Sequence, residues 1–287
     1  MSDPGETLLC MMTSIDPSQD DELLAFADKA TEIVSSIGVE VVPENVWLQT
    51  AIAGVAHMND LTAGMVATIK AGKPQGVQPL LRAVLDATFT TMHVYFGRKE
   101  AWEAQFRSDW SFRARVNAEA GWKQPPWPPE GLPDWCKKFM PGSKERLGPE
   151  KITTVVSAMP FLNEDKPGME FLRGFVEQGY TIVYRMESHL AHATLTTLRP
   201  YMREGPDRDF VLVGTLGSPA WRWRKPLGLA LDRVLSLASW VIRELPDGTA
   251  PQPVLELGNE YTPMRTYAHT AEDADEPKEV TRTDSSE

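Results

Sequence analysis

The sequence has few cysteines and no long apolar run, and each of these features excludes a class of protein. Only two cysteines occur in 287 residues, so we expect neither a disulfide framework nor a zinc site, and a reducing compartment suits them. No apolar run approaches the roughly 18 residues of a membrane-spanning helix. The first residues, MSDPGETLLCMMTS, lack the basic start of a secretory signal. The sequence therefore predicts a cytoplasmic protein with no membrane partner.

Positive charge is also scarce. The chain holds 29 lysines and arginines against 40 aspartates and glutamates, which gives a net charge of −11 and an isoelectric point near 5.0. Such a chain repels phosphate backbones at long range, so broad nucleic-acid binding is not expected. A local basic pocket remains compatible with this balance.

The motifs of several common enzyme classes are missing. The sequence has no HExxH, no GxSxG and no glycine-rich phosphate loop. It also lacks the paired Glu-x-x-His motifs of a di-iron bundle. Ligands for a metal could come only from scattered residues on three predicted helices. These are His57, Asp60, Asp86, His93, His189 and His192. We therefore predict no metal and no cofactor.

Helical periodicity is the strongest positive signal. Apolar residues recur at helical spacing over residues 20–37, 45–71, 75–120, 168–203 and 225–245. Gly97 is a candidate break in the third of these segments, and a short helix is expected after Pro149. The pattern predicts an all-α fold, a single bundle of about five to seven helices, two of them long.

The remaining segments differ in composition from these helices. We predict a flexible N-terminal arm over residues 1–18 and an all-α domain over residues 19–246. Residues 247–287 should form a disordered tail that is first rich in proline and then acidic. Within the domain, residues 122–149 are rich in proline, which forbids a regular helix, and in tryptophan, which argues against disorder. We therefore predict that residues 122–149 form an ordered non-helical segment, here called the excursion, that crosses the surface of the domain. Residues 205–220 predict a loop with a short strand at FVLVG.

Residues 184–198, YRMESHLAHATLTTL, place polar side chains on one side of a predicted helix. At 100° per residue these side chains fall within about 140° of one another. They are Tyr184, Arg185, Ser188, His189 and His192. The apolar residues of the same helix lie on the other side, which is the expected core face.

The segment GVQPLLRAVLDATFTTMHVYF carries a similar polar line. Arg82, Asp86 and His93 fall within about 40° of one another on a helix, and Arg82 and Asp86 are spaced for an ion pair. Both polar lines could face water, as charged helix faces usually do. Alternatively, they could face one another across a cleft, as in bundles whose sites use facing helices. The apolar neighbours of Arg82 favour the second interpretation, and both remain open.

A third polar group lies in the segment AHMND. His57 and Asp60 are one helical turn apart among small residues. They predict either a packed helix interface with a hydrogen-bonded histidine or a supporting polar cluster beside Arg82 and Asp86. The first interpretation is the more common use of such residues.

The pair of segments GVQPLLRAVLDA and YTIVYRMESHLAHATL resembles an uncharacterised bacterial family of all-helical proteins, described only as a domain of unknown function. The resemblance covers roughly residues 45–245. Its signature positions are Arg82, Asp86, Tyr184, Ser188 and His192. Asp86 stands where the family more often has glutamate.

The later segment also resembles, more distantly, the HEPN group of helical ribonucleases and their inactive relatives. Their motif is an arginine followed by four to six residues and a histidine, and Arg185 and His192 satisfy it. Met186 departs from the polar residue that usually follows the arginine. The resemblance implies metal-independent cleavage of RNA by a dimeric toxin or defence component. His192 would be the general acid or base and Arg185 would stabilise phosphate charge.

A non-catalytic interpretation competes with this one. The bundle would bind a protein partner or a second copy of itself, and its polar lines would be structural networks that fix helix register. The segment WRWRKP at residues 221–226 also has two interpretations. It could stack on bases, or it could anchor a helix start with arginine lying over indole.

Overall fold

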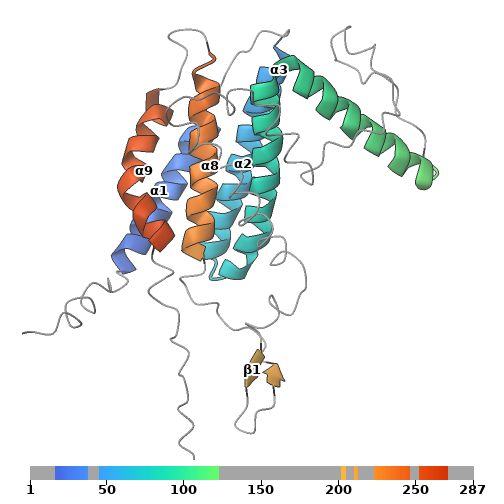
Figure 1. Cartoon of the computed structure of the whole chain (residues 1–287). Helices are drawn as coiled ribbons and strands as arrows, with labels where there is room; N and C mark the ends of the chain where they lie inside the picture. The colour runs from blue at the N-terminus through green and yellow to red at the C-terminus, as the bar shows by residue number, and fades with distance from the viewer. Residues whose placement is uncertain are drawn as a thin grey trace, which may run out of the picture.

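The computed structural model describes residues 17–37, 45–122, 202–204, 210–212, 223–245 and 252–270. Its helices are α1 (Pro17–Ser35), α2 (Val46–Lys70), the 3₁₀ helix η2 (Pro74–Gly76), α3 (Val77–Glu119), α8 (Arg224–Ile242) and α9 (Gln252–Thr270). A short hairpin pairs β1 (Met202–Glu204) with β2 (Phe210–Leu212) in antiparallel fashion. The predicted all-α fold is therefore confirmed (Figure 1).

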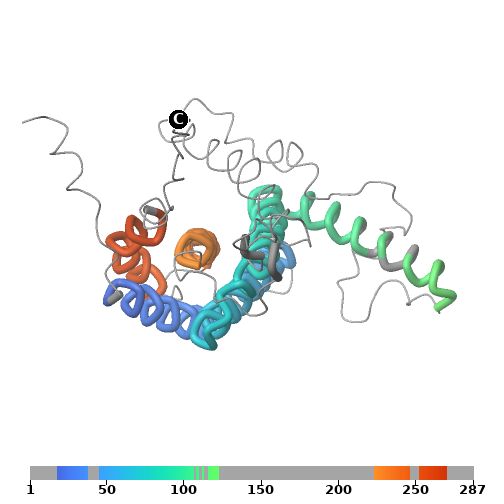
Figure 2. Tube along the Cα trace, turned by 90° about the horizontal axis from the view of Figure 1, so that it is seen from below, coloured from blue at the N-terminus to red at the C-terminus, as the bar shows by residue number. Residues whose placement is uncertain are grey.

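The other helices of the bundle curve around one side of α8. Viewed along their axes, α9, α1, α2 and the first half of α3 form a curved row, and α8 lies on its inner side (Figure 2). Of the 19 residues of α8, 14 are buried, because it packs against α2, α3 and α9 at once. None of the helices in the described ranges is long and apolar enough to cross a membrane.

The apolar stripes predicted from the sequence form the core. Leu227 and Leu231 of α8 and Leu81 and Leu85 of α3 are at most 1 % exposed. Each fully buried leucine contributes about 1.5–3 kcal/mol relative to an exposed one. α2, α3 and α8 therefore form where the periodicity predicts them, because their apolar faces have one shared core to fill.

Two glycines allow close contact between helices. A Cβ atom on Gly54 of α2 would lie 2.1 Å from Oγ1 of Thr91 on α3, and one on Gly228 of α8 would lie 2.8 Å from the Cβ of Ala268 on α9. Real Cβ atoms do not come this close, so a side chain at either position would push two helices apart. Both helix pairs therefore depend on the missing side chain.

α3 is bent at Arg98, where φ is 54° and ψ is −136°. Residues 77–97 pack in the bundle, whereas residues 99–119, here called the arm, leave it (Figure 1). The predicted break therefore occurs, but the positive φ falls on Arg98 and not on Gly97. A non-glycine residue in such a region costs on the order of 1–3 kcal/mol.

The predicted disordered tail is wrong for residues 252–270, which form α9 and pack against α1 and α8. Prolines and acidic residues led to the prediction of a tail. However, Pro253 falls in the first turn, where proline is tolerated. The apolar face of α9 (Val254, Leu257, Tyr261 and Ala268) is buried. This face supplies the burial that holds the helix in place.

Two other boundaries also change. α1 begins at Pro17, inside the predicted N-terminal arm. The helix predicted over residues 168–203 does not reach its expected end, because Met202 and Arg203 belong to β1. The rest of that helix, the short helix after Pro149, residues 123–149 of the excursion and the acidic end after residue 270 lie outside the described residues. The strand expected at FVLVG is present as β2.

Candidate functional site

The predicted site residues divide into two groups. Tyr184, Arg185, Ser188, His189 and His192 lie outside the part of the chain that the structure describes. Their placement opposite the Arg82 line therefore stays a prediction. The other four, Arg82, Asp86, His57 and Asp60, lie on α2 and α3 and can be placed.

Arg82 and Asp86 form the predicted ion pair on α3. Nε of Arg82 donates to Oδ2 of Asp86 at 3.1 Å, and the two side chains are 21 % and 42 % exposed. Pairs at this spacing on a helix contribute about 0.3–0.5 kcal/mol. The pair therefore adds little to the stability of the fold, and its main effect is to hold the two charged groups in a fixed orientation.

The pair belongs to a longer polar stripe along α3, formed by Gln78, Arg82, Asp86 and His93. Within the described ranges, Oε1 of Gln78 and Oδ1 of Asp86 are shielded from solvent and accept no hydrogen bond. His93 is 5 % exposed, and burial lowers its pKa. Buried polar atoms are normally paired, so a stripe with shielded acceptors and a buried neutral histidine differs from an ordinary solvated face.

His57 and Asp60 do not join this stripe. Both are exposed on α2, and no hydrogen bond or ion pair connects either of them to another described residue. Asn59, between them, is buried instead, and its Nδ2 donates to the Thr31 carbonyl and to Oγ of Ser35, both at 2.9 Å. Among the described residues, His57 and Asp60 therefore make no polar contact with the Arg82 line, because α2 turns Asn59 towards α1 and leaves its neighbours exposed.

A network centred on Arg224 joins α1, α8 and α9 and was not predicted. Arg224 is 3 % exposed, and its Nε and Nη2 donate to the two carboxylate oxygens of Asp20 at 2.6 and 2.8 Å. The Tyr267 hydroxyl donates to the same carboxylate at 2.7 Å. The guanidinium lies 6.0 Å from the Trp223 ring centroid. For Trp223 and Arg224, the interpretation of WRWRKP as the anchor of a helix start is therefore confirmed.

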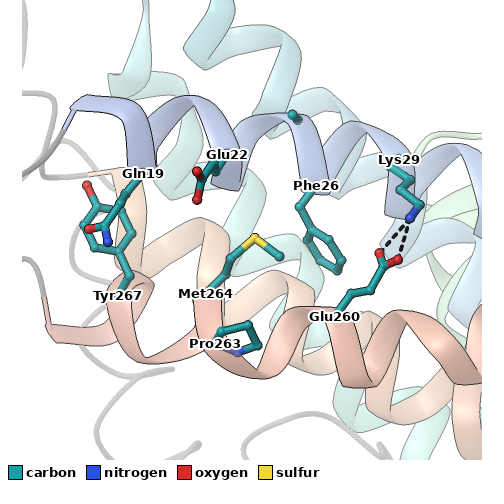
Figure 3. A pocket seen from close by; sticks show the side chains of 9 residues that line it. Gln19, Glu22, Phe26, Lys29, Glu260, Pro263, Met264 and Tyr267 are labelled. Carbon is teal, nitrogen blue, oxygen red and sulfur yellow. Dashed lines mark hydrogen bonds and ion pairs between the residues drawn. The ribbon is translucent and has the colours of Figure 1, made fainter.

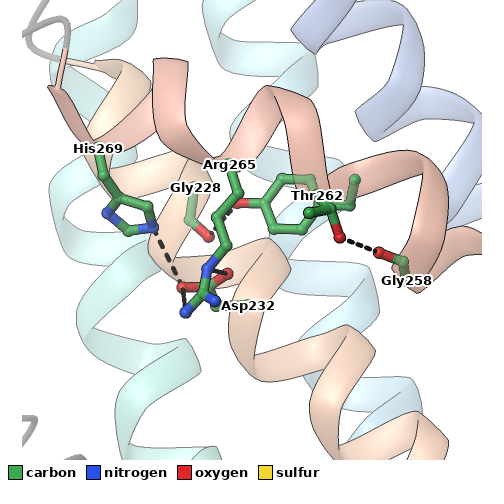
Figure 4. A network of polar contacts seen from close by, with 7 residues as sticks. Gly228, Asp232, Gly258, Thr262, Arg265 and His269 are labelled. Atoms are coloured by element: carbon green, nitrogen blue, oxygen red, sulfur yellow. Dashed lines mark hydrogen bonds and ion pairs between the residues drawn. The ribbon is translucent and has the colours of Figure 1, made fainter.

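A second network joins α8 to α9 (Figure 4). Asp232 is 8 % exposed at its side chain and meets Nε of Arg265 at 2.9 Å and Nε2 of His269 at 3.1 Å. Tyr261 donates to the Gly228 carbonyl at 2.9 Å. Burial, followed by the charge of Asp232, raises the pKa of Tyr261, so its hydroxyl stays a donor. The network therefore joins the two helices through polar contacts.

A third network lies at the bend of α3. Nη2 of Arg98 donates to Oε1 of Glu244 at 2.7 Å, and the Tyr95 hydroxyl meets the same oxygen at 3.1 Å. The guanidinium carbon lies 4.0 Å from the Trp47 ring centroid. The hydrogen bond from Arg98 lowers the pKa of Glu244, whereas burial and then the charge of Glu244 raise the pKa of Tyr95 to about 12.

A groove of about 510 Å³ runs between α1 and α9 (Figure 3). Phe26 and Met264 give it apolar walls, and Lys29 spans one end with Nζ 2.7 Å from both carboxylate oxygens of Glu260. The groove suits an apolar side chain better than a charged substrate. No group of three histidine, cysteine or acidic residues in the described ranges is arranged to hold a metal ion.

Comparisons with protein-family models, with curated proteins and with solved structures found no match to this chain. The resemblances to the bacterial helical family and to the HEPN group therefore stay predictions. Functional inference rests on the contacts of the described residues: a polar stripe, three ion-pair networks, a groove and a projecting arm.

Proposed function

We propose that this protein is a self-associating helical module, in which the arm of one copy binds the α1–α9 groove of another. The observation that carries the proposal is the exposure of two aromatic residues, one on the arm and one just beyond it. Phe112 lies on the arm and is 51 % exposed, and Trp122 follows the end of α3 and is 66 % exposed. The arm leaves its own bundle (Figure 1). Aromatic residues in such positions typically anchor protein interfaces.

The end of α3 holds Trp122 in place. The Trp122 amide donates to the Asn117 carbonyl at 2.7 Å, and the Gly121 amide donates to the Ala118 carbonyl at 3.2 Å. With Gly121 at a φ of 67°, these two bonds form a Schellman motif. The residue after the glycine often contacts the side chain five or six positions back, which here is Asn117 or Val116. The backbone at Trp122 is therefore fixed, while most of its side chain stays exposed.

The groove has the matching chemistry for this tryptophan. Its walls include the Phe26 ring, which stacks on Tyr261 with 5.4 Å between centroids, and the thioether of Met264. Sulfur and ring faces pack well against an indole. Its volume of about 510 Å³ leaves room for one large side chain and the backbone that carries it. A second copy of the chain supplies both halves of such an interface.

Molecular mass in solution tests the proposal. Sedimentation or light scattering over a concentration series should show assembly of the unaltered protein. Trp122→Ala should weaken assembly at least tenfold, since interface anchors contribute 2 kcal/mol or more. Ala25→Glu, at an exposed groove position, should do the same. The control Ala67→Glu places the same charge at an exposed position on α2 and should leave assembly unchanged. A protein that stays monomeric throughout contradicts the proposal.

Metal-independent cleavage of RNA is a second candidate, and the polar stripe of α3 favours it. Gln78 and Asp86 offer shielded acceptors beside the Arg82 guanidinium, which suits one wall of a site completed by Arg185 and His192. The HEPN resemblance, which implies a dimeric enzyme, is compatible with self-association.

RNA cleavage has its own test. His192→Ala should abolish cleavage of single-stranded RNA while the melting temperature stays nearly unchanged. His57→Ala is the matched control, because His57 is exposed and has no hydrogen bond or ion pair within the described residues. If the purified protein leaves diverse RNAs intact and its expression is harmless to cells, this second candidate is excluded.

A further inference from the structure

The bend of α3 sits on a residue that disfavours it. Arg98 has φ 54° and ψ −136°, which is close to the first central position of a type II′ turn, where glycine dominates. Gly97 stands directly before it and does not have a positive φ. A bend that arose from chain flexibility alone would fall on the glycine. Something must therefore hold Arg98 in this conformation.

The side chain of Arg98 makes the contacts that hold it. Its guanidinium lies over Trp47 of α2, 4.0 Å from the ring centroid, and over Tyr95 at 5.1 Å. Nη2 also pairs with Oε1 of Glu244, just beyond α8, at 2.7 Å. Cation–π and ionic contacts thus tie one residue of α3 to α2 and to the segment just beyond α8. Arg98, Trp47 and Glu244 are here called the clamp.

The beginning of the arm has a smaller anchor of its own. Trp102 is 5 % exposed and packs with Val46 and Val94. Its Nε1 donates to Oγ1 of Thr50 at 2.8 Å. These contacts lie within the first turns of the arm. Beyond them, Phe112 is 51 % exposed. The Trp102 contacts fix the start of the arm close to the bend.

We propose that the clamp is a conformational lock that keeps α3 bent, and that its release lets residues 77–119 form one continuous helix. The straight form recovers helical φ and ψ at Arg98 and gives up the contacts with Trp47, Glu244 and Thr50. The bent form keeps those contacts and holds Arg98 in a disfavoured conformation. The two forms point the end of the arm in different directions. The lock goes beyond the proposed self-association and holds whether or not the arm binds a second copy.

A distance measurement along α3 tests the lock. The full-length chain first receives Cys10→Ser and Cys136→Ser, so that it has no native cysteine. Spin labels are then attached at two exposed positions, Ala67→Cys on α2 and Ala118→Cys near the end of the arm. Labelled protein is diluted with an excess of unlabelled protein, so that only distances within one copy are observed. α2 ends next to the start of α3, and a straight helix of this length carries Ala118 about 60 Å from Val77. Any bend shortens that separation.

The expected results separate the clamp from general flexibility. The labelled protein with an unaltered clamp should give a single distance between the two labels that is shorter than the straight-helix value. Arg98→Ala should add a longer population near the straight-helix value, and Glu244→Gln should add a smaller one. Arg98→Gly should keep more of the short distance than Arg98→Ala, because glycine accepts the positive φ. Lys99→Ala, which removes the neighbouring 56 % exposed cation, should leave the distance unchanged.

Two results would overturn the lock. In the first, Arg98→Ala and Glu244→Gln keep the helical circular dichroism of the unaltered protein and also keep its distance distribution. In the second, the unaltered protein already shows the straight-helix distance. If Arg98→Ala does not fold, Glu244→Gln decides alone, because it keeps the size of the side chain and removes only the charge partner.

Discussion

Two helix pairs in this bundle each contain a close contact at a glycine, but they differ in the ion pairs that accompany it. α8 and α9, together with α1, are joined by nearly buried ion pairs centred on Arg224 and Asp232. α2 and α3 meet through small and apolar side chains, with Gly54 placed directly against Thr91. Charge pairs fix register through direction and geometry, whereas small residues fix it through shape. The two pairs should therefore fail in different ways when they are altered.

Removing the charge partner at the α1–α8 contact should have the largest effect. Arg224→Met leaves the Asp20 carboxylate without its bidentate guanidinium and should lower the free energy of unfolding by about 3–5 kcal/mol. Lys29→Met breaks another α1 ion pair, whose side chains are 52 % and 46 % exposed, and should lower it by less than about 1 kcal/mol. Urea unfolding measures both variants. Similar losses of unfolding free energy in the two variants would contradict the claim that burial makes the Arg224–Asp20 pair the stronger of the two.

Filling the space at Gly54 should have the next largest effect. Gly54→Ala places a Cβ against Oγ1 of Thr91 and should cost about 1–3 kcal/mol through overpacking. Gly258→Ala meets nothing within 4 Å and should stabilise α9 by about 0.5–1 kcal/mol. Thermal unfolding of the two variants should therefore move in opposite directions. If Thr91→Ala does not recover part of the Gly54→Ala loss, the steric account is wrong.

Acid should weaken the clamp at the bend of α3. The pKa of Glu244 lies below its ordinary value of 4.5 because Arg98 donates to it. A lowered pKa in the folded state gives stability that is present above the ordinary value and is lost as the pH falls through the folded value. The melting temperature should therefore fall less steeply below about pH 4.5 in Glu244→Gln than in the unaltered protein. Identical pH profiles would show that the ion pair contributes nothing to stability.

The polar stripe of α3 should matter least for stability. Asp86→Asn removes the charge of a 42 % exposed side chain and should change the free energy of unfolding by less than about 0.5 kcal/mol. Asp20→Asn, which disturbs the partner of the nearly buried Arg224, should cost several times more. Parallel urea titrations give the ratio of the two losses. A large loss at Asp86 would make the stripe a structural network and remove its support for RNA cleavage.

The sequence predicts those features of the fold that depend on the spacing of residues close together in the chain. Apolar residues at helical intervals predicted α2, α3 and α8 within one or two turns, and the four-residue step predicted the Arg82–Asp86 pair. Asp20 and Arg224 are 204 positions apart, so no local pattern could pair them. The only signal was an acidic helix start and an arginine next to tryptophan.

The errors also have local causes. The sequence does not predict α9 because Pro251 precedes it and Pro253 and Pro263 lie within it, although burial against α1 and α8 outweighs the cost of the two internal prolines. The bend was expected at Gly97 because glycine is the permissive residue. It falls on Arg98 because side-chain contacts with Trp47 and Glu244 select that position. Tertiary contacts decided both cases, and neither can be read from neighbouring residues.

The most direct test of self-association through the arm is energy transfer between two differently labelled copies. A donor at Ala118→Cys on the arm and an acceptor at Gln19→Cys beside the groove are placed on separate chains without other cysteines and then mixed. Our account predicts transfer at concentrations where the mass exceeds that of one chain, and its loss with Trp122→Ala. Assembly without transfer, or transfer that survives Trp122→Ala, would contradict it.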